Sequence, residues 1–333
     1  MLDISEAYQE KFSKYKFIDL FAGIGGFHYA LTSYGAKCVF ASEWDKHASK
    51  VYENNFNVTP FGDITKISET DIPEHDIICG GFPCQAFSVS GKQKGFHDTR
   101  GTLFFDILRI ADYHKPKLLF LENVKNIQAH DGGNTIKVII DNLDQLGYKV
   151  FYKLLNTSNY GLPQNRERVY FVCFRKDLNV LNFEFPKPIN NHISLESILE
   201  DNTDNKYNIN RQDVVITKQL DLGNNLFDEP NKKNKPIQIG YVNKGGQGER
   251  IYHPTGHSIT LSAYGGGAGA KTGLYLINNK LRKLTERECA KLQGFPDSFK
   301  LHENRNQCYK QFGNSVSINV LQHILKNIID SLA

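Results

Sequence analysis

The sequence predicts an α/β protein with a doubly wound, mostly parallel sheet and a second, smaller β-rich domain. Two observations carry this prediction. From Lys16 onward, short β-rich apolar runs alternate with helical patterns of about ten residues or more, which is typical of strands joined by covering helices. After Lys235 the pattern changes to short strand-like runs broken by clusters of glycine, which favours a small β-rich domain with loops.

The composition fits a globular protein. The 333 residues are 40% hydrophobic and 23% charged, enough for one large domain or two unequal ones. No segment approaches the roughly 20 apolar residues of a membrane span, so we expect a cytoplasmic protein with no membrane partner. Six scattered cysteines without metal-like spacing predict reduced thiols and no metal site. A formal charge of +4 permits nucleic acid as a partner but hardly argues for it.

The elements of the first domain follow one another in a regular order. We expect strands at the apolar runs 16–21, 37–42, 76–81, 117–124, 149–156 and 168–174. A further short strand is expected to end at Asp63, in the run FGDI. The helical patterns between the strands begin near Gly26 and Asp45 and cover 103–113 and 135–146.

The composition shifts near Pro186, and residues 190–235 are rich in Asn, Asp and Lys with little periodicity, which indicates a boundary. A final pattern from Val316 to Leu332 has an apolar helical face that needs a partner surface, so we expect it to return to the first domain. The expected division is a first domain over 1–195 and 310–333, a second over 196–284, and a hinge over 285–309.

A cluster of glycines between the first strand and first helix indicates a nucleotide-like cofactor, because absent side chains let a ligand approach the backbone and the helix N-terminus. His28 breaks the G-x-G-x-x-G spacing, which weakens the prediction of a dinucleotide-binding site. Glu43 closes the second strand, and Asp63 follows, so three successive strand ends point at one nucleoside. The alternative is a structural turn with two surface acids.

Three kinds of reactive side chain follow the later strands. Cys84 lies after the strand ending at Gly81, at the edge where open α/β sheets bind ligands. Glu122 ends the next strand, and Arg166 and Arg168 precede the last one. Together they offer a nucleophile, a proton-managing acid and guanidinium anchors. The alternatives are an inert loop cysteine, a satisfied cap, and exposed ion pairs with Glu167.

Five runs resemble, in order, the motifs of the cytosine-5 DNA methyltransferases. They are DLFAGIGGF, Pro83-Cys84-Gln85, Glu122-Asn123-Val124, Gln164-x-Arg166-x-Arg168 and Gly313-Asn314-Ser315-Val316. Five motifs in one order are far more specific than any single tripeptide. The resemblance covers nearly all of the chain and is weakest before Tyr15 and across 190–235. It implies a Rossmann-like methyltransferase fold that uses S-adenosylmethionine, with target recognition in the second domain.

The family's mechanism implies four catalytic residues. Cys84 attacks carbon 6 of cytosine, Glu122 meets the charge that develops at ring N3, Arg168 holds the exocyclic oxygen, and Arg166 supports the pocket. Desolvation on base entry would favour a protonated Glu122. Since the chemistry cannot reach a stacked base, the target cytosine must flip out of double-stranded DNA.

The resemblance also implies binding residues. For S-adenosylmethionine and its product S-adenosylhomocysteine they are Phe21, Gly23, Gly25, Gly26, Glu43, Trp44, Asp63, Ile64, Pro83, Leu103 and Asn314. For DNA they are Ser90 and Lys92 in a flap over the flipped base, and Gln247, Arg250, Tyr264, Gly266 and Gly267 in the second domain. These loops resemble those of a family member that recognises GCGC. The resemblance therefore predicts GCGC as the site, with the first inner cytosine methylated. The family's small enzymes usually protect prokaryotic host DNA from a restriction endonuclease, and we expect a monomer.

Three rival functions stay open at this point. A nicotinamide-dependent oxidoreductase would explain the glycine turn but leaves Cys84, Glu122 and both arginines without a role. A catalytically silent DNA-binding module would bind duplex without transferring methyl groups. A methyltransferase acting on tRNA would prefer that acceptor to duplex DNA, although the large second domain makes it less attractive.

Overall fold

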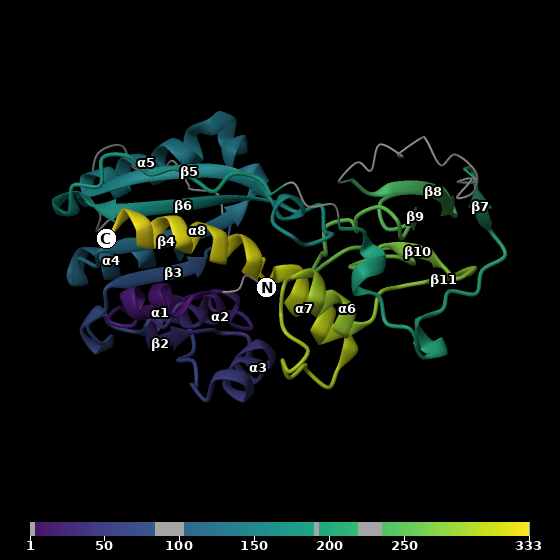
Figure 1. Ribbon diagram of the computed structural model, residues 1–333, viewed down its shortest axis with the longest axis horizontal. Helices are drawn as coiled ribbons and strands as arrows, with labels where there is room; N and C mark the ends of the chain where they lie inside the picture. Colours follow the sequence, from purple (N-terminus) through teal and green to yellow (C-terminus); the bar gives the residue numbers. More distant parts are fainter. Residues whose placement is uncertain (1–3, 84–102, 190–192, 219–234, 333) are drawn as a thin grey trace. The chain divides into compact units, whose positions relative to one another are not determined.

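The computed structural model of the chain describes residues 4–83, 103–189, 193–218 and 235–332 (Figure 1). It divides into two compact units. The first, here the six-stranded unit, comprises 2–155, 167–187 and 320–333. The second, here the five-stranded unit, comprises 156–166 and 188–319. This division differs in detail from the functional boundaries expected from the sequence, which stay a prediction.

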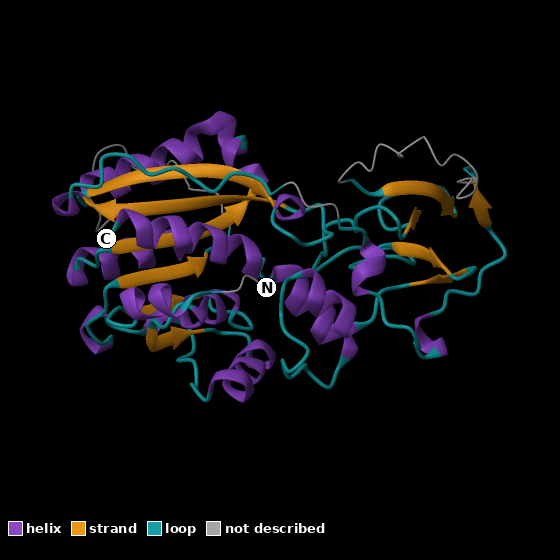
Figure 2. Ribbon diagram, in the orientation of Figure 1, coloured by secondary structure: helices purple, strands orange, loops and turns teal. Residues whose placement is uncertain are grey.

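The six-stranded unit is a mixed sheet with covering helices, which confirms the expected α/β class (Figure 2). The strand order is β2-β1-β3-β4-β6-β5. The strands are β1 (Lys16–Leu20), β2 (Lys37–Ser42), β3 (Ile77–Gly81), β4 (Leu118–Val124), β5 (Tyr148–Asn156) and β6 (Glu167–Arg175). The helices are α1 (Glu6–Phe12), α2 (Gly26–Ser33), α3 (Lys46–Phe56), α4 (Leu103–His114), α5 (Asn134–Gln145) and α8 (Ile318–Ser331).

The pairings of the sheet explain its sequence pattern. β1 runs parallel to β2 and β3, and β3 runs parallel to β4. Strands covered on both faces read as continuous apolar runs, and the central strands meet this condition. Their buried core side chains include Ile18, Leu20, Ile78, Leu119, Leu121 and Phe171.

One feature of this unit was left open by the sequence, and another differs from the expectation. β6 is antiparallel to β4. The sequence could not reveal this direction, because the apolar run 168–174 fits either one equally well. No strand ends at Asp63, so that expectation was wrong. The segment makes only a single bridge between Phe61 and Ser42, and Asp63 then caps the 3₁₀ helix Ile64–Lys66.

The expected return of the C-terminal helix is confirmed, since residues from Val320 onward belong to the six-stranded unit. Figure 1 draws α8 in yellow across this unit. The Tyr34 hydroxyl donates to the Gln322 carbonyl at 2.8 Å, and the Gln322 amide donates to the Ser33 hydroxyl at 3.0 Å. The apolar face at Val320, Leu321 and Ile324 is fully buried.

The five-stranded unit has its own sheet and a small core. The strand order is β11-β10-β9-β8-β7, with a core that includes Ile239, Val242, Ile251 and Leu274. The strands are β7 (Val214–Ile216), β8 (Ile237–Val242), β9 (Arg250–His253), β10 (Leu274–Ile277) and β11 (Lys280–Arg282). Two helices that the sequence analysis did not predict are α6 (Glu286–Leu292) and α7 (Arg305–Asn314).

Within the described ranges, no helix combines the length and apolar character needed to cross a membrane.

Candidate active site

The polar residues of interest gather at one edge of the six-stranded sheet. β1, β3 and β4 are parallel, so their carboxyl ends lie at the same edge, and the antiparallel β6 begins there. The chain passes from β1 to β2 on one side of β1 and then crosses back to β3 on the other side, so the order of the strands reverses at β1. In open α/β sheets such a switch point is where ligands bind.

The glycine turn after β1 is held open by a carboxylate. Glu43, directly after β2, accepts hydrogen bonds from the amides of Gly23 and Asp45, each at 2.7 Å. Burial raises the pKa of the Glu43 carboxyl, and these amides oppose that shift. A Cβ built on Gly23 would meet no atom within 4 Å, so there is open space beside this backbone. The turn requires an unusual backbone conformation, since even Phe21, which is not a glycine, adopts a positive φ of 55°.

Further cofactor candidates follow β2 and begin α4. Trp44 is 80% exposed, which leaves a flat aromatic face available to a ligand. Ile64 is buried, and Leu103 is half-buried at the start of α4. Asp63 accepts from the amide and hydroxyl of Thr65, and the hydroxyl contact lowers the pKa of its carboxyl. These residues fit a nucleoside ligand, since they offer carboxylate acceptors, an aromatic face and an open glycine backbone.

Gly25→Ala is expected to destabilise the fold by about 1–3 kcal/mol. Gly25 has a φ of +86°, and its Cβ would come 2.2 Å from Cε2 of Phe56. Phe56 cannot move aside easily, because it stacks on His28 with ring centroids 4.0 Å apart. The matched variant Gly23→Ala should cost about 1 kcal/mol, from its positive φ alone.

Urea unfolding and calorimetric titration with S-adenosylhomocysteine separate the two glycines. Gly25→Ala should lower the free energy of unfolding more than Gly23→Ala does. Relative to its loss of stability, Gly23→Ala should lose more affinity for S-adenosylhomocysteine, because its Cβ enters the open space beside the turn. Equal stability losses in both variants would contradict the crowding at Gly25.

A buried ion pair lies at the same edge. Arg168 Nε is 3.1 Å from Glu122 Oε1, and the side chains are 15% and 9% exposed. The register of β4 with β6 explains the meeting, since Glu122 pairs with Tyr170 and Val124 pairs with Arg168. Glu167, the alternative partner suggested by the sequence, instead pairs with Lys125 at 2.8 Å. An acid and a guanidinium held together out of water can transfer or hold a proton on a bound ring.

Asn123 links this pair to the segment that carries the cysteine. Its buried side-chain amide donates to the Phe82 carbonyl at 2.8 Å, and its oxygen accepts from the Val124 amide. Phe82 is buried and Pro83 is exposed. Cys84, Ser90 and Lys92 lie outside the described residues. Sequence reasoning gave Asn123 no structural role, although its place inside the third motif was a signal.

Arg166 has a different setting from Arg168, within the five-stranded unit. Its buried guanidinium donates to the carbonyls of Leu261, Gly313 and Ser315. Through these bonds it holds the segment that carries Asn314, which is itself exposed. The described contacts of Arg166 are thus those of a positioning residue.

Buried amides extend this network. Gln164 donates to the Leu292 carbonyl at 2.8 Å and accepts from the Leu261 amide. Gln293, which the sequence analysis passed over, donates to the Phe312 carbonyl at 2.7 Å. Gln293 follows the capping box formed by Thr285 and Glu288, and that S/T-x-x-E pattern is readable in the sequence.

The two glycine loops expected to read DNA lie against each other. The Gly269 amide donates to the Gly248 carbonyl at 2.6 Å. A Cβ on Gly248 would come 2.5 Å from the Gly266 carbonyl oxygen, and one on Gly267 would come 3.1 Å from that of Gly248. Only glycine permits this approach. The loops expose Gln247, Arg250 and Tyr264, and the Tyr264 side chain is 71% exposed.

Comparison with known proteins gives a consistent family. The profile of the C-5 cytosine-specific DNA methylases matches residues 15–330. The chain is 55% identical to the type II methyltransferase M.HhaI of Haemophilus parahaemolyticus, over 95% of each sequence. It is 46% identical to the type II methyltransferase M.HaeII of Haemophilus aegyptius, over 96% of this chain and 94% of that one.

Solved structures agree on the fold. The S. pombe Dnmt2 methyltransferase is 19% identical with a TM-score of 0.69, covering 95% of this chain and 99% of that chain. The Entamoeba histolytica methyltransferase EhMeth is 19% identical with a TM-score of 0.70, covering 96% and 99%. With the motifs, the edge of the sheet and the sequence relatives all in agreement, the chain belongs to the family of C-5 cytosine-specific DNA methylases and is a DNA cytosine-5 methyltransferase.

Proposed function

We propose that this enzyme flips a target cytosine out of duplex DNA and methylates its carbon 5 through a covalent adduct on Cys84. The observation that carries the proposal is the buried Glu122–Arg168 pair, tied through Asn123 to the backbone that precedes Pro83 and Cys84. Glu122 supplies an acid and Arg168 an anchor for the ring, and the segment linked to them by Asn123 leads into the Cys84 thiol. An oxidoreductase would have no use for that combination.

The proposed chemistry follows from the ring. Carbon 5 of cytosine is a poor nucleophile, so the Cys84 thiolate adds to carbon 6 and pushes electron density toward ring N3. Glu122 gives its proton to N3, and Arg168 donates to the exocyclic oxygen. The resulting enamine takes the methyl group at carbon 5. Loss of the carbon 5 proton to solvent water then expels Cys84 as the thiolate, and N3 returns its proton to Glu122, which restores the ring and the acid.

Membership of a methyltransferase family implies use of S-adenosylmethionine. When bound, it supplies the methyl group. We assign its recognition to the glycine turn and the adjoining residues. In this proposal Glu43 accepts from the ribose hydroxyls and Trp44 covers the adenine. Asp63 accepts from the adenine amino group, and Phe21 lies beneath the adenosine. Pro83, Leu103 and Asn314 complete the pocket. The open space beside Gly23 and the 80% exposed Trp44 support this assignment.

DNA recognition is proposed for the five-stranded unit. Gln247 fills the space that the flipped base leaves, and Arg250 reads guanine. A bidentate contact of that kind gives about 1–3 kcal/mol of discrimination. Tyr264, Gly266 and Gly267 let the backbone approach the duplex, while Ser90 and Lys92 close over the extruded base. The packed, exposed glycine loops support one continuous reading surface.

The recognition sequence that we propose is GCGC, with the first inner cytosine methylated. The 55% identity to M.HhaI supports it, because it extends over 95% of the chain. The type II relatives indicate a restriction-modification system. We propose a cognate endonuclease that cuts the same site, a monomeric enzyme, and a bacterial cytoplasmic location.

Alkylation of the native enzyme is expected to modify Cys84 in preference to the other cysteines. Burial raises the pKa of Cys38 to about 12 and that of Cys308 to about 11, and it also raises the pKa values of Cys79, Cys173 and Cys289. These thiols stay protonated near pH 8 and react slowly. Peptide mass spectrometry after brief iodoacetamide treatment checks this, and faster labelling of Cys38 than of Cys84 would contradict it.

Bisulfite sequencing of plasmid from cells that express the chain tests the proposed function. We expect protection of the first inner cytosine of GCGC, and no protection when Cys84→Ser is expressed at the same level. Protection in another sequence context would overturn the proposed site. Methylation of tRNA in preference to duplex DNA, or no methylation in cells that contain folded enzyme, would overturn the proposed function.

A further inference from the structure

A pocket lies at the opposite edge of the six-stranded sheet from the candidate active site. Its volume is about 770 Å³, within the roughly 300–1,000 Å³ typical of small-molecule sites. Lys16 begins β1, Asp76 and Lys117 directly precede β3 and β4, and Arg175 ends β6. These are the amino ends of the parallel strands and the carboxyl end of the antiparallel one. We call this site the amino-edge pocket.

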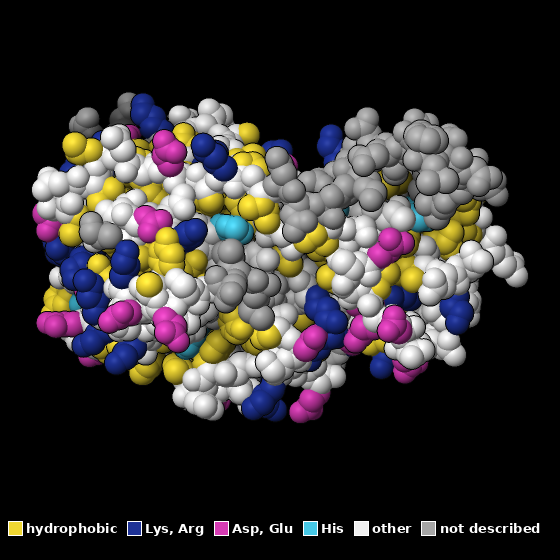
Figure 3. Space-filling model, in the orientation of Figure 1, with side chains coloured by type: hydrophobic (Ala, Val, Ile, Leu, Met, Phe, Trp, Pro, Cys, Tyr) yellow, Lys and Arg dark blue, Asp and Glu magenta, His cyan; other side chains and the backbone are white. Residues whose placement is uncertain are grey.

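The amino-edge pocket is cationic. Of its 13 lining residues, five are Lys or Arg and two are acidic. The acid nearest the lysines is already engaged, because Asp76 binds the Lys117 ammonium at 2.9 Å and the Lys16 amide at 3.0 Å. Within the described ranges, no carboxylate pairs with the ammonium groups of Lys14 and Lys16. Figure 3 shows Lys and Arg side chains gathered over this end of the unit, mixed with acidic ones.

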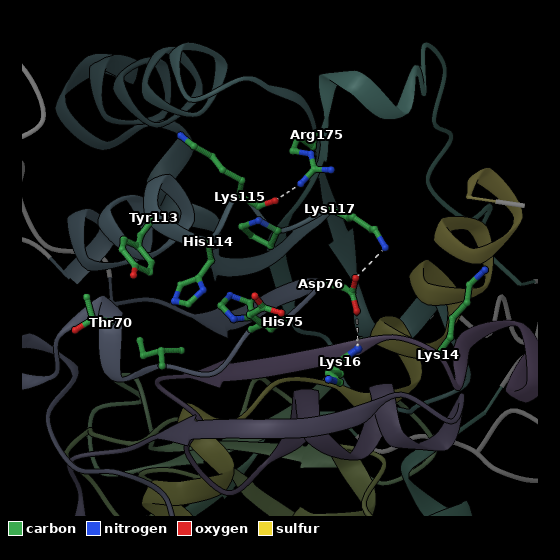
Figure 4. A pocket seen from close by; sticks show the side chains of 13 residues that line it. Lys14, Lys16, Thr70, His75, Asp76, Tyr113, His114, Lys115, Lys117 and Arg175 are labelled. Carbon is green, nitrogen blue, oxygen red and sulfur yellow. Dashed lines mark hydrogen bonds and ion pairs between the residues drawn. The ribbon is translucent and has the colours of Figure 1, made fainter.

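Three lysines lie at one end of the pocket. Lys14 and Lys117 both lie over the ring of Tyr15, with their ammonium nitrogens 5.5 and 5.4 Å from its centroid. Figure 4 shows Lys14, Lys16 and Lys117 at one end of the pocket. A bound anion would be stabilised by the positive charge that these side chains bring to this end of the pocket.

The other end of the pocket is aromatic. Figure 4 shows Tyr113 and His114 there, beside Lys115 and away from Lys14, Lys16 and Lys117. The rings of His75 and His114 are 4.6 Å apart, and those of Tyr113 and His114 are 4.9 Å apart. Tyr113 is 57% exposed, so its face is open to a planar ligand.

His75 adds a polar contact between the two ends. Its Nδ1 lies 2.8 Å from the Pro73 carbonyl and therefore donates to it. Burial lowers the pKa of His75 to about 4, so the neutral ring keeps a lone pair on Nε2. That buried nitrogen has no hydrogen-bond partner among the described residues, and a buried acceptor without a donor is costly.

We propose that the amino-edge pocket binds a phosphorylated small molecule of nucleotide size, with its phosphates on Lys14, Lys16 and Lys117 and its ring against Tyr113 and His114. A sugar hydroxyl would serve as the donor that His75 lacks. Duplex DNA fits less well, because the cations line a recess shared with aromatic side chains, whereas a phosphate backbone needs cations on an accessible face. The pocket belongs to the other edge of the sheet from Glu43 and Glu122, so it is distinct from the methylation site.

Calorimetric titration of the full-length enzyme with guanosine 5′-diphosphate tests the proposal. Saturating S-adenosylhomocysteine is present throughout, so that the methyl-donor site is blocked. We expect saturable binding. Guanosine alone and inorganic pyrophosphate alone should each bind at least about tenfold more weakly, because each reaches only one end of the pocket.

The double variant Lys14→Glu, Lys16→Glu should weaken nucleotide binding at least about tenfold and leave the methylation rate unchanged. Lys137→Glu, at an exposed lysine of α5 outside the pocket, is the matched control and should bind as the parent does. No saturable binding below about 5 mM nucleotide, an equal loss in the control, or equal affinity for pyrophosphate and nucleotide would overturn the proposal. Displacement of the nucleotide by duplex lacking the target site would assign the pocket to DNA and also overturn it.

Discussion

Replacing Cys84 by serine is expected to reduce methyl transfer at least about 10³-fold while the enzyme still binds S-adenosylhomocysteine and duplex DNA. A serine hydroxyl is not ionised near neutral pH, so the side chain cannot add to carbon 6 of the ring. The cofactor candidates around Gly23 and Glu43 do not depend on the thiol. Transfer of tritium from labelled methyl donor to duplex, under single-turnover conditions, measures the loss.

Cys38→Ser provides the control for this substitution. Cys38 lies in β2, its thiol donates to the Phe40 carbonyl at 3.4 Å, and a serine hydroxyl can make the same bond. The control should keep methylation within about twofold of the parent. Normal turnover by Cys84→Ser would remove Cys84 as the nucleophile, whatever its effect on stability.

Glu122→Gln is expected to slow the transfer step by about 10²–10⁴-fold, the usual contribution of a general acid. The amide is isosteric and its oxygen can still accept from Arg168 Nε, which lies 3.1 Å from the carboxylate. It cannot, however, give a proton to ring N3. The loss should therefore appear in the single-turnover rate and leave cofactor affinity unchanged.

Glu167→Gln is the matched control for the acid. Glu167 begins the strand that carries Arg168, but its carboxylate is 39% exposed and pairs with Lys125. Exposed pairs of this kind contribute little, about 0–1 kcal/mol, so the rate should change less than about threefold. If both substitutions slowed transfer equally, the account of Glu122 as the proton donor would fail.

The sequence was informative wherever local pattern decides structure. The central apolar runs became β1, β3 and β4, because strands covered on both faces need continuous apolar side chains. The helical face from Val320 to Ile328 packs into the six-stranded unit, as its spacing predicted. Asp63 was misplaced, because the short run FGDI resembles a strand end although its acid serves as a local cap.

Contacts between residues that are distant in the sequence could not be predicted from local sequence patterns. The sequence placed Glu122 and Arg168 on adjoining strands, but their meeting depends on the antiparallel register of β4 and β6. Arg166 and Arg168 are two residues apart and look equivalent in the motif. One donates to three backbone carbonyls and the other pairs with an acid. Such differences arise from segments distant in the chain, so no local periodicity reports them.

The central claim is that a sulfur atom bonds transiently to a cytosine that has left its helix. A duplex with 5-fluorocytosine at the first inner cytosine of GCGC tests it most directly, because fluorine blocks the final elimination and leaves the adduct in place. With S-adenosylmethionine present, we expect a denaturation-resistant enzyme–DNA complex whose cross-linked peptide contains Cys84, and none with Cys84→Ser. Full methylation activity on ordinary duplex together with no covalent complex on the fluorinated one would contradict the account.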